Sequence, residues 1–191
     1  MDSTRNRRRS FRMDDRIQVW VHPLNEEALE GILQDFGRYR LNYCLKSHFI
    51  NQREEQQPKF QILKKRNADI AAYIAHLEEQ IIELADRLQT TLEETSERRK
   101  ELVSVNLSAD GIRLECAQSL EVGQSVELGL DLPTNSTHIV LIAKVIRCDE
   151  SGDGKCTVSL EYTHILDEDI EAIIRHLAKL QQIQLQARRA S

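Results

Sequence analysis

The sequence predicts an α+β fold: a small antiparallel β-barrel or sandwich that is interrupted by a long helical insertion. Three observations lead to this prediction. From Leu102 to about Ile165 the chain holds five short runs with β character, separated by turn sequences such as SADG and ESGDG. From about residue 25 to residue 100 it has one proline, two glycines and an abundance of strong helix formers. Before that block, residues 15–21 alternate between apolar and polar types.

The first predicted element is a strand over residues 15–21. Its apolar residues Ile17, Val19 and Val21 recur with the period of two that a strand with one buried face requires. Pro23 then ends the strand, because proline lacks the backbone N–H that a sheet uses for pairing. The partner strands follow only after the helical block, so the barrel is expected to be discontinuous in sequence.

The helical block divides the chain into two expected domains. Residues 1–22 and 101–191 are expected to form the β domain with a C-terminal helix, and residues 25–98 to form an inserted helical domain. Within the insertion, Pro58 is expected to separate two helices. Proline disfavours helical geometry in the residue before it and is well placed to start a new helix.

A heptad repeat marks the second half of the insertion. Its a positions are Ile74, Ile81 and Leu88, and its d positions are Leu63, Ile70, Leu77 and Leu84. Asn67 falls at a further a position, where a buried polar residue can set the register of a helical bundle. The pattern predicts a coiled coil.

This repeat is expected to join chains rather than to cover the barrel. At about 1.5 Å per residue, residues 63–92 would reach roughly 45 Å, further than a small barrel extends. Ala71, Ala85 and Leu92 at e positions widen the apolar face, which favours a bundle of three or more helices. An amphipathic helix packed on its own barrel is the alternative. The residues expected to contact other chains are Ile70, Ile74, Leu77, Ile81, Leu84 and Leu88.

The last predicted element is a helix over residues 167–189. It begins with acidic residues and ends with basic residues, as the helix dipole favours. It is expected to close one end of the barrel with an apolar face, and a lid or partner-binding helix that moves with a ligand is the alternative. This face is made by Ile170, Ile173, Ile174, Leu177 and Leu180.

Composition argues against several classes of function. The formal net charge of −5 argues against a body that binds nucleic acid or acidic membranes. No apolar run reaches the roughly 18 residues of a membrane span, and no apolar signal-peptide core follows the arginine-rich start, so a cytoplasmic protein is expected. The four cysteines and six histidines lack the spacing of zinc sites, and the chain has neither a GxSxG motif nor a Walker-type loop. No metal, no cofactor and no enzymatic activity are therefore expected.

Two short motifs carry the chemistry that remains. Near the start, Arg8 and Arg12 form an RxxxR motif that Arg7 precedes, and residues 106–111 form NxSxxG. By itself, an arginine run is typical of a solvated tail or a nucleic-acid arm, and NLSADG is typical of a hairpin turn. Guanidinium groups bind phosphate oxygens and the O6 and N7 atoms of guanine in a bidentate manner. Asparagine and serine side chains hydrogen-bond base edges or phosphates, and a glycine allows a left-handed turn or a close backbone approach.

Together and in this order, the two motifs resemble those of the PilZ domain. The later strands GIRLE, AKVIRC and VSLEY and the C-terminal helix extend the resemblance over residues 7–22 and 101–185. The resemblance implies a six-stranded antiparallel β-barrel that binds the bacterial second messenger cyclic di-GMP. The ligand-binding residues that it implies are Arg7, Arg8, Arg12, Asn106, Ser108 and Gly111. The insertion resembles that of PilZ proteins whose two long inserted helices carry heptads and assemble chains, which implies a homo-oligomer, with a tetramer as one candidate.

The expected function is that of a non-enzymatic bacterial receptor. Cyclic di-GMP is expected to order the arginine-rich arm against the barrel, and a partner protein is expected to recognise the changed surface or oligomer. Two alternatives remain open: an oligomeric scaffold of PilZ-like barrels that does not bind cyclic di-GMP, and a nucleic-acid adaptor that uses the arginine arm.

Overall fold

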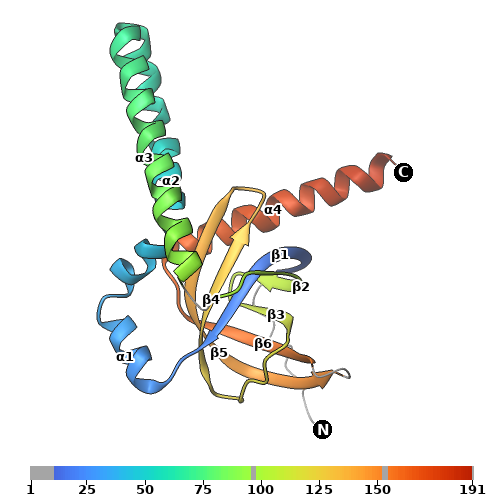
Figure 1. The fold of residues 1–191 in the computed structure, drawn as a ribbon. Coiled ribbons are helices and arrows are strands. Elements are labelled where there is room, and N and C mark those ends of the chain that lie inside the picture. Colours follow the sequence, from blue (N-terminus) through green and yellow to red (C-terminus); the bar gives the residue numbers. More distant parts are fainter. Residues whose placement is uncertain (1–10, 96–97, 152–154, 191) are drawn as a thin grey trace. The chain divides into compact units, whose positions relative to one another are not determined.

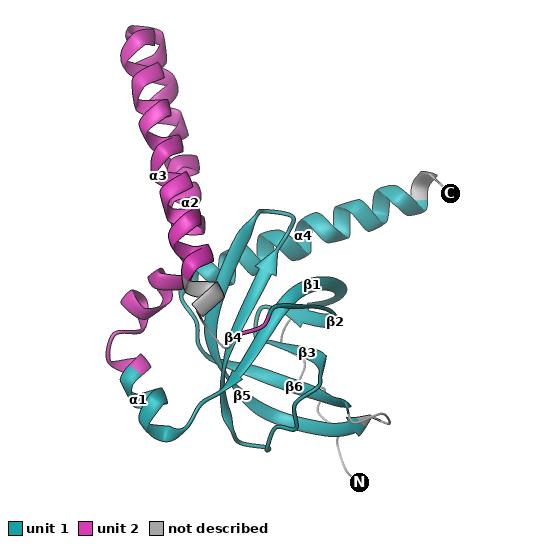
Figure 2. Ribbon diagram, viewed as in Figure 1, with its two compact units in different colours: residues 1–31, 100–191 teal, residues 32–99 magenta. Residues whose placement is uncertain are grey.

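The chain divides into two compact units in the computed structural model, which describes residues 11–95, 98–151 and 155–190. One unit consists of residues 1–31 and 100–191, and the other of residues 32–99 (Figure 2). The first unit contains a β-barrel and the C-terminal helix, and the second contains a pair of long helices. Within the described ranges, no helix combines the length and the apolar character that crossing a bilayer requires.

The described strands close into a six-stranded antiparallel barrel with the order β1-β2-β3-β6-β5-β4 (Figure 1). The strands are β1 (Arg12–Pro23), β2 (Glu101–Ser108), β3 (Gly111–Cys116), β4 (Ser125–Leu132), β5 (Thr137–Ser151) and β6 (Lys155–His164). The predicted fold class is therefore confirmed. Strand β1 begins at Arg12, three residues earlier than the alternation predicted, because its backbone continues to pair with β2 up to Ser108.

Strand β1 completes the barrel although the helical block separates it from the other strands. It pairs with β2 along its first half and with β4 along its second half, so both of its edges are used. The alternating residues Ile17 and Val19 point inward and are buried, as their spacing predicted. They join a core to which every strand contributes, and burying each large aliphatic side chain contributes about 1.5–3 kcal/mol.

Helix α4 (Asp167–Ala190) packs its first half on this core. Three acidic residues occupy its first turn, where they complement the helix dipole. Ala172, Ile173 and Leu177 are buried in the barrel core. Ile174 was expected on the same face, but it is 51% exposed because it lies about 100° around the helix from Ile173. The second half of α4 extends beyond the core, and its side chains from Gln181 to Arg188 are exposed.

The insertion contains helices α1 (Glu26–Gln34), α2 (Phe36–Arg66) and α3 (Ala68–Thr95). The predicted break at Pro58 is wrong: Pro58 lies inside α2, on an exposed face where the carbonyl group that loses its partner lies next to solvent. The break is at Asn67, whose backbone N–H donates to the Leu63 carbonyl and whose Oδ1 accepts from the Ile70 N–H at 3.1 Å. Asn67 therefore ends one helix and caps the next.

This turn changes the interpretation of the heptad. Leu63 belongs to α2, so the repeat on α3 starts at Ile70. Asn67 lies in the turn between α2 and α3, where it caps the helix ends, so it is not part of a continuous heptad helix. The heptad helix is α3 alone, with 28 residues.

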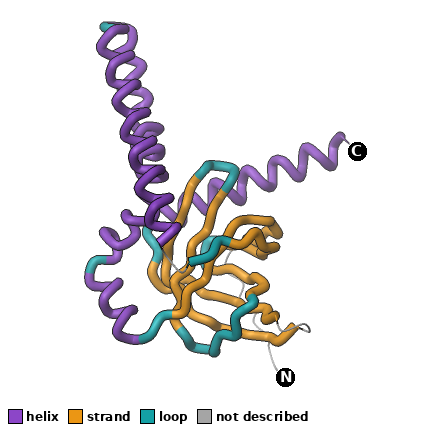
Figure 3. The backbone as a smooth tube through the Cα atoms, viewed as in Figure 1, coloured by secondary structure: helices purple, strands orange, loops and turns teal. Residues whose placement is uncertain are grey.

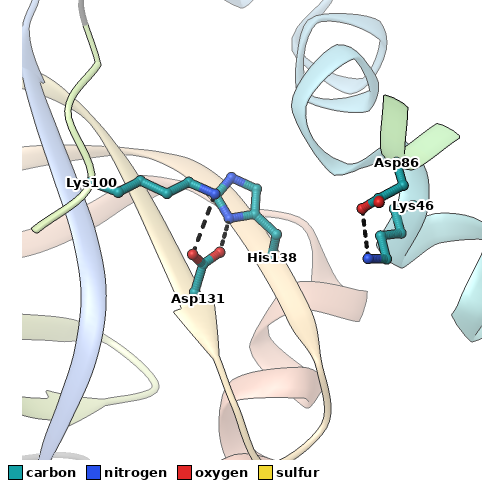
Figure 4. Close-up of polar contacts among 5 residues, drawn as sticks. All are labelled: Lys46, Asp86, Lys100, Asp131 and His138. Atoms are coloured by element: carbon teal, nitrogen blue, oxygen red, sulfur yellow. Dashed lines mark hydrogen bonds and ion pairs between the residues drawn. The ribbon is translucent and has the colours of Figure 1, made fainter. Parts of the chain in front are cut away.

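Helices α2 and α3 form an antiparallel pair within the second unit (Figure 3). Ala71 and Ala85 are buried, because they face α2, so the e-position alanines pack inside the hairpin rather than between chains. An ion pair at 2.6 Å joins Lys46 on α2 to Asp86 on α3 (Figure 4). The remaining apolar stripe of α3 is between 39% and 62% exposed at Ile70, Leu77, Ile81, Leu84 and Leu88, whereas Ile74 is half-buried.

Candidate functional site

The pairing of β1 with β2 brings the two motifs together. Arg12 lies opposite Ser108, and Asp14 lies opposite Asn106. The Asn106 Nδ2 donates to Asp14 Oδ1 at 2.7 Å, so a side-chain hydrogen bond also joins the two strands. Since paired strands lie about 4.8 Å apart, Arg12 stands one strand away from NxSxxG although more than 90 residues separate them. The other predicted arginines, Arg7 and Arg8, lie outside the described residues.

Ser108 and Gly111 form the turn between β2 and β3. Ser108 is fully buried, and its Oγ donates to the Gly111 carbonyl oxygen at 2.9 Å. A Cβ on Gly111 would lie 2.4 Å from the carbonyl oxygen of Leu160 on β6. The φ of Gly111 is not positive, so this residue must be glycine because β6 passes so close, and a left-handed turn is not the reason. Both residues stabilise the turn that follows the strand of Asn106.

A groove of about 500 Å³ lies on the outer face of the barrel beside Asn106. It is lined by Asp14, Asp15, Ser104, Val105, Asn106, Arg113, Leu114, Glu115 and Thr157. Arg113 lies directly opposite Asn106 in the β2–β3 pair, and its side chain is exposed. The motifs did not indicate Arg113. Its sequence signal is its place between the buried residues Ile112 and Leu114, which directs an arginine to the outer face.

Tyr162 on β6 lies close to Arg12. Its hydroxyl is buried and has no hydrogen-bond partner among the described residues. Burial raises the pKa of Tyr162 far above its usual range, and the positive charge of Arg12 opposes this shift only in part. Its backbone N–H donates to the Asp110 carbonyl at 3.0 Å, which ties β6 to the turn of the second motif. Tyr162 is thus a neutral donor beside Arg12, and neither sequence motif indicated it.

A buried histidine connects α4 to β1 next to the site. The Nε2 of His176 lies 2.8 Å from Asp15 Oδ2, and its Nδ1 lies 2.6 Å from Thr134 Oγ1. Burial lowers the pKa of His176, although the neighbouring Asp15 carboxylate raises it. In the neutral ring, Nε2 donates to the carboxylate and Nδ1 accepts from the Thr134 hydroxyl. This network positions α4 relative to Asp15, one residue from Asp14.

A second polar cluster lies on β4 and β5, away from the two motifs. Asp131 contacts His138 through a short hydrogen bond and Lys100 at 3.3 Å (Figure 4). Burial raises the pKa of Asp131, but the hydrogen bond and charge of His138 and the charge of Lys100 outweigh this effect and lower it below its ordinary value. Asp131 also lies opposite Gln18 of β1. Within the described parts of the chain, no group of three or more His, Cys, Asp or Glu side chains could hold a metal ion.

Two solved structures have folds similar to this chain. The Bacillus subtilis inhibitor of motility MotI/DgrA is 18% identical, with a TM-score of 0.49 and coverage of 92% of this chain and 52% of that chain. This chain therefore spans about half the length of MotI/DgrA. A Xanthomonas campestris protein, described as a tetrameric PilZ domain self-assembled through a helical bundle, is 19% identical, with a TM-score of 0.58 and coverage of 93% of this chain and 92% of that chain. At these identities the similarity concerns the fold.

Comparison with protein families gives a direct assignment. No curated protein matches the chain. The family described as "PilZ domain" matches residues 84–179, a range that includes strands β2 to β6 and the first half of α4. This match spans half of the sequence and includes the NxSxxG turn, whereas strand β1 lies outside it. The chain belongs to the PilZ domain family.

Proposed function

We propose that this chain is a non-enzymatic receptor for cyclic di-GMP that signals to a partner protein. Its family supports the proposal, because PilZ domains are generally cyclic di-GMP receptors. The observation that carries the proposal is the β1–β2 register, in which Arg12 faces Ser108 and Asp14 faces Asn106. Two distant motifs that each have chemistry suited to a guanine dinucleotide are thereby neighbours.

The charges around the site suggest which part of the ligand each residue binds. A phosphate is favoured near Arg7, Arg8 and Arg12, because guanidinium groups bind phosphate oxygens through charge-assisted hydrogen bonds. A phosphate would be repelled by Asp14, whereas a carboxylate accepts hydrogen bonds from the N–H groups of a guanine edge. We therefore place a guanine at the pair formed by Asp14 and Asn106 and the phosphates nearer the arginines.

The remaining residues complete this assignment. Arg113, directly across from Asn106, is positioned to donate to guanine O6 and N7 from β3. Ser108 and Gly111 act by holding the turn, since the Ser108 hydroxyl is already bonded to the Gly111 carbonyl. The proposed contacts with the ligand are thus Arg7, Arg8, Arg12, Asn106 and Arg113, and the proposed turn-forming residues are Ser108 and Gly111.

We further propose that the chain forms a homo-oligomer through α3. Five large apolar residues of its heptad stripe are exposed although α2 and α3 already pack together. An apolar stripe of this length is typical of a surface that binds another helix. The fold of the tetrameric Xanthomonas campestris protein supports this proposal, because that protein is described as assembling through a helical bundle. The same stripe favours a second candidate function, an oligomeric scaffold that does not bind cyclic di-GMP.

Isothermal titration calorimetry with cyclic di-GMP separates the receptor from the scaffold. The receptor is expected to give saturable binding, and Arg8→Ala and Arg12→Ala are each expected to weaken it by about tenfold or more, because a charge-assisted hydrogen bond contributes roughly 1.5–3 kcal/mol. Arg16→Ala is the matched control: Arg16 is exposed on the same face of β1, four residues beyond Arg12. Absence of binding heat up to millimolar ligand would contradict the receptor proposal and favour the scaffold. Equal losses in Arg12→Ala and Arg16→Ala would show that overall charge, not the motif, governs binding.

A further inference from the structure

A second groove lies between the start of β1 and the distal half of α4. Its volume is about 280 Å³, and both of its walls belong to the first compact unit. Its lining residues are Phe11, Arg12, Met13, Asp14, Gln181, Gln184, Leu185 and Arg188. Asp14 also lines the groove beside Asn106, so the two grooves adjoin at this residue.

The residues of α4 that line this groove share one face of the helix. Gln181, Gln184, Leu185 and Arg188 are spaced at i, i+3, i+4 and i+7, which places them in one stripe. The first half of α4 is anchored by Ile173 and His176, both fully buried. Because α4 is one continuous helix of 24 residues, fixing its first half also fixes the direction of its distal half. The stripe therefore lies across the groove from the start of β1.

The chemistry of the groove suits a purine nucleotide. Phe11 is 56% exposed and Leu185 is 46% exposed, so one apolar surface from each wall is available to the flat face of a base. Arg12 and Arg188 supply guanidinium groups for phosphate or for guanine O6 and N7. Gln184 supplies an amide, which both donates to and accepts from a base edge.

We propose that the distal half of α4 is the second wall of the cyclic di-GMP site and that Arg188 and Phe11 are ligand-binding residues. This inference rests on the proposed function. Cyclic di-GMP has two guanines, and the two adjoining grooves give each guanine its own surface. One guanine lies at Asp14 and Asn106, the other stacks on Phe11 beside Arg188, and Arg12 binds a phosphate between them. Ligand binding then fixes the end of α4 against β1, which makes this helix the element that a partner protein senses.

The test is a calorimetric titration of the full chain and its variants with cyclic di-GMP. Arg188→Ala is expected to weaken binding by about tenfold. Arg188→Lys is expected to give an intermediate affinity, because lysine keeps the charge but cannot bind in a bidentate manner. Phe11→Ala is expected to weaken binding by roughly tenfold through the loss of base stacking. Arg175→Ala is the matched control on α4: Arg175 is exposed, pairs with Glu171 and lies outside the groove.

The possible outcomes separate this inference from the proposed function. If the parent binds and both Arg188→Ala and Phe11→Ala bind as the parent does, the second wall is wrong and the receptor function stands. If the parent does not bind, both proposals are overturned. If Phe11→Ala lowers the melting midpoint of the ligand-free protein, the ligand affinity of Arg188→Ala is the sole test of the second wall. Arg188 is exposed near the end of α4, so its truncation leaves the core intact. Equal losses in Arg188→Ala and Arg175→Ala would also overturn the inference.

Discussion

Asn106 on β2 donates a hydrogen bond to Asp14 on β1 at 2.7 Å, and the two residues lie directly opposite each other in the barrel. Asp14 follows the RxxxR motif by two residues, and Asn106 opens NxSxxG. One exposed contact thus joins the two motifs and presents a carboxylate and an amide side by side. In the proposed site this pair binds a guanine and Arg12, at the start of the same strand, binds a phosphate.

The first prediction concerns Asn106 itself. Asn106→Ala is expected to weaken cyclic di-GMP binding by about tenfold while lowering the free energy of unfolding by no more than about 1 kcal/mol, because the bond to Asp14 is exposed to solvent. Calorimetry and urea unfolding measure the two effects. Gln18→Ala, an exposed polar truncation on β1 outside both grooves, is the control. Unchanged ligand affinity in Asn106→Ala would remove this pair from the site.

The second prediction concerns the turn between β2 and β3. Gly111→Ala is expected to destabilise the protein by about 1–3 kcal/mol, because the added Cβ would lie 2.4 Å from the Leu160 carbonyl oxygen and one strand must shift. Gly123→Ala is a useful comparison, since a Cβ there meets no atom within 4 Å but Gly123 has a φ of +93°. Urea unfolding measures both variants. A Gly111→Ala protein as stable as the parent would contradict the close approach of β6.

The same turn gives a third prediction. Ser108→Ala is expected to lower the free energy of unfolding by about 1–3 kcal/mol, because it removes the buried donor to the Gly111 carbonyl oxygen. From sequence alone this substitution would be expected to leave the fold intact, since serine is a common turn residue, but Ser108 is fully buried. Matched melting curves with and without ligand distinguish a loss of stability from a loss of binding. A variant with the parent's midpoint and weakened binding would assign Ser108 to the ligand.

The fourth prediction concerns pH. Burial lowers the pKa of His176, so the unfolded chain binds this proton more readily than the folded protein does. The contribution of His176 to stability is therefore fully present above its unfolded pKa near 6.5 and decreases as the pH falls below that value toward the folded pKa. Urea unfolding at pH 7.5 and at about pH 5.5 measures this loss. That window lies above the ordinary value of 3.8 for Asp131, whose pKa is lowered further, so Asp131 stays charged.

Two variants isolate this histidine. His176→Gln is expected to destabilise the protein at neutral pH and to reduce the difference in stability between the two pH values, because the titrating group is removed. His164→Gln is the control, since His164 is exposed at the end of β6 and its Nδ1 lies 3.3 Å from the hydroxyl of the neighbouring Thr163. A pH dependence that survives unchanged in His176→Gln would show that other groups cause it.

The fifth prediction tests the apolar stripe of α3. Ile81→Lys combined with Leu84→Lys is expected to yield a monomer, because both side chains are exposed in the isolated chain and charges in an apolar interface are costly. Ile74 is left unchanged because it is half-buried and its substitution would also disturb the hairpin. Light scattering measures the mass, and circular dichroism is expected to retain the β signal of the barrel. His76→Lys, on a solvent-facing heptad position, is the control. A parent that is already monomeric would contradict assembly through α3.

The sequence by itself determined the strands, the extent of the helical block and the order in which they occur. Strand periodicity of two and helix periodicity near 3.6 are local properties, so the β runs, the helical block and the discontinuous barrel could be recognised without a structure. The two motifs also identified Arg12 and Asn106 as candidates. Only the tertiary structure placed them on adjacent strands, because the pairing of residues 12–19 with 101–108 is set by backbone bonds between segments separated by the whole insertion.

The tertiary structure also determined where the helix boundary lies and which face of α3 is buried. A proline and an asparagine both favour a helix boundary, and Asn67 rather than Pro58 became the boundary, since its N–H and its side chain could both be satisfied there. The heptad could not show that Ala85 faces α2 while Leu84 faces outward, because both are apolar and one residue apart. Arg113 on β3 and Tyr162 on β6 lie beside the candidate site, and His176 on α4 contacts Asp15 next to it. Each is an ordinary residue in its own segment, and only the closure of the barrel brings it near Arg12 and Asn106.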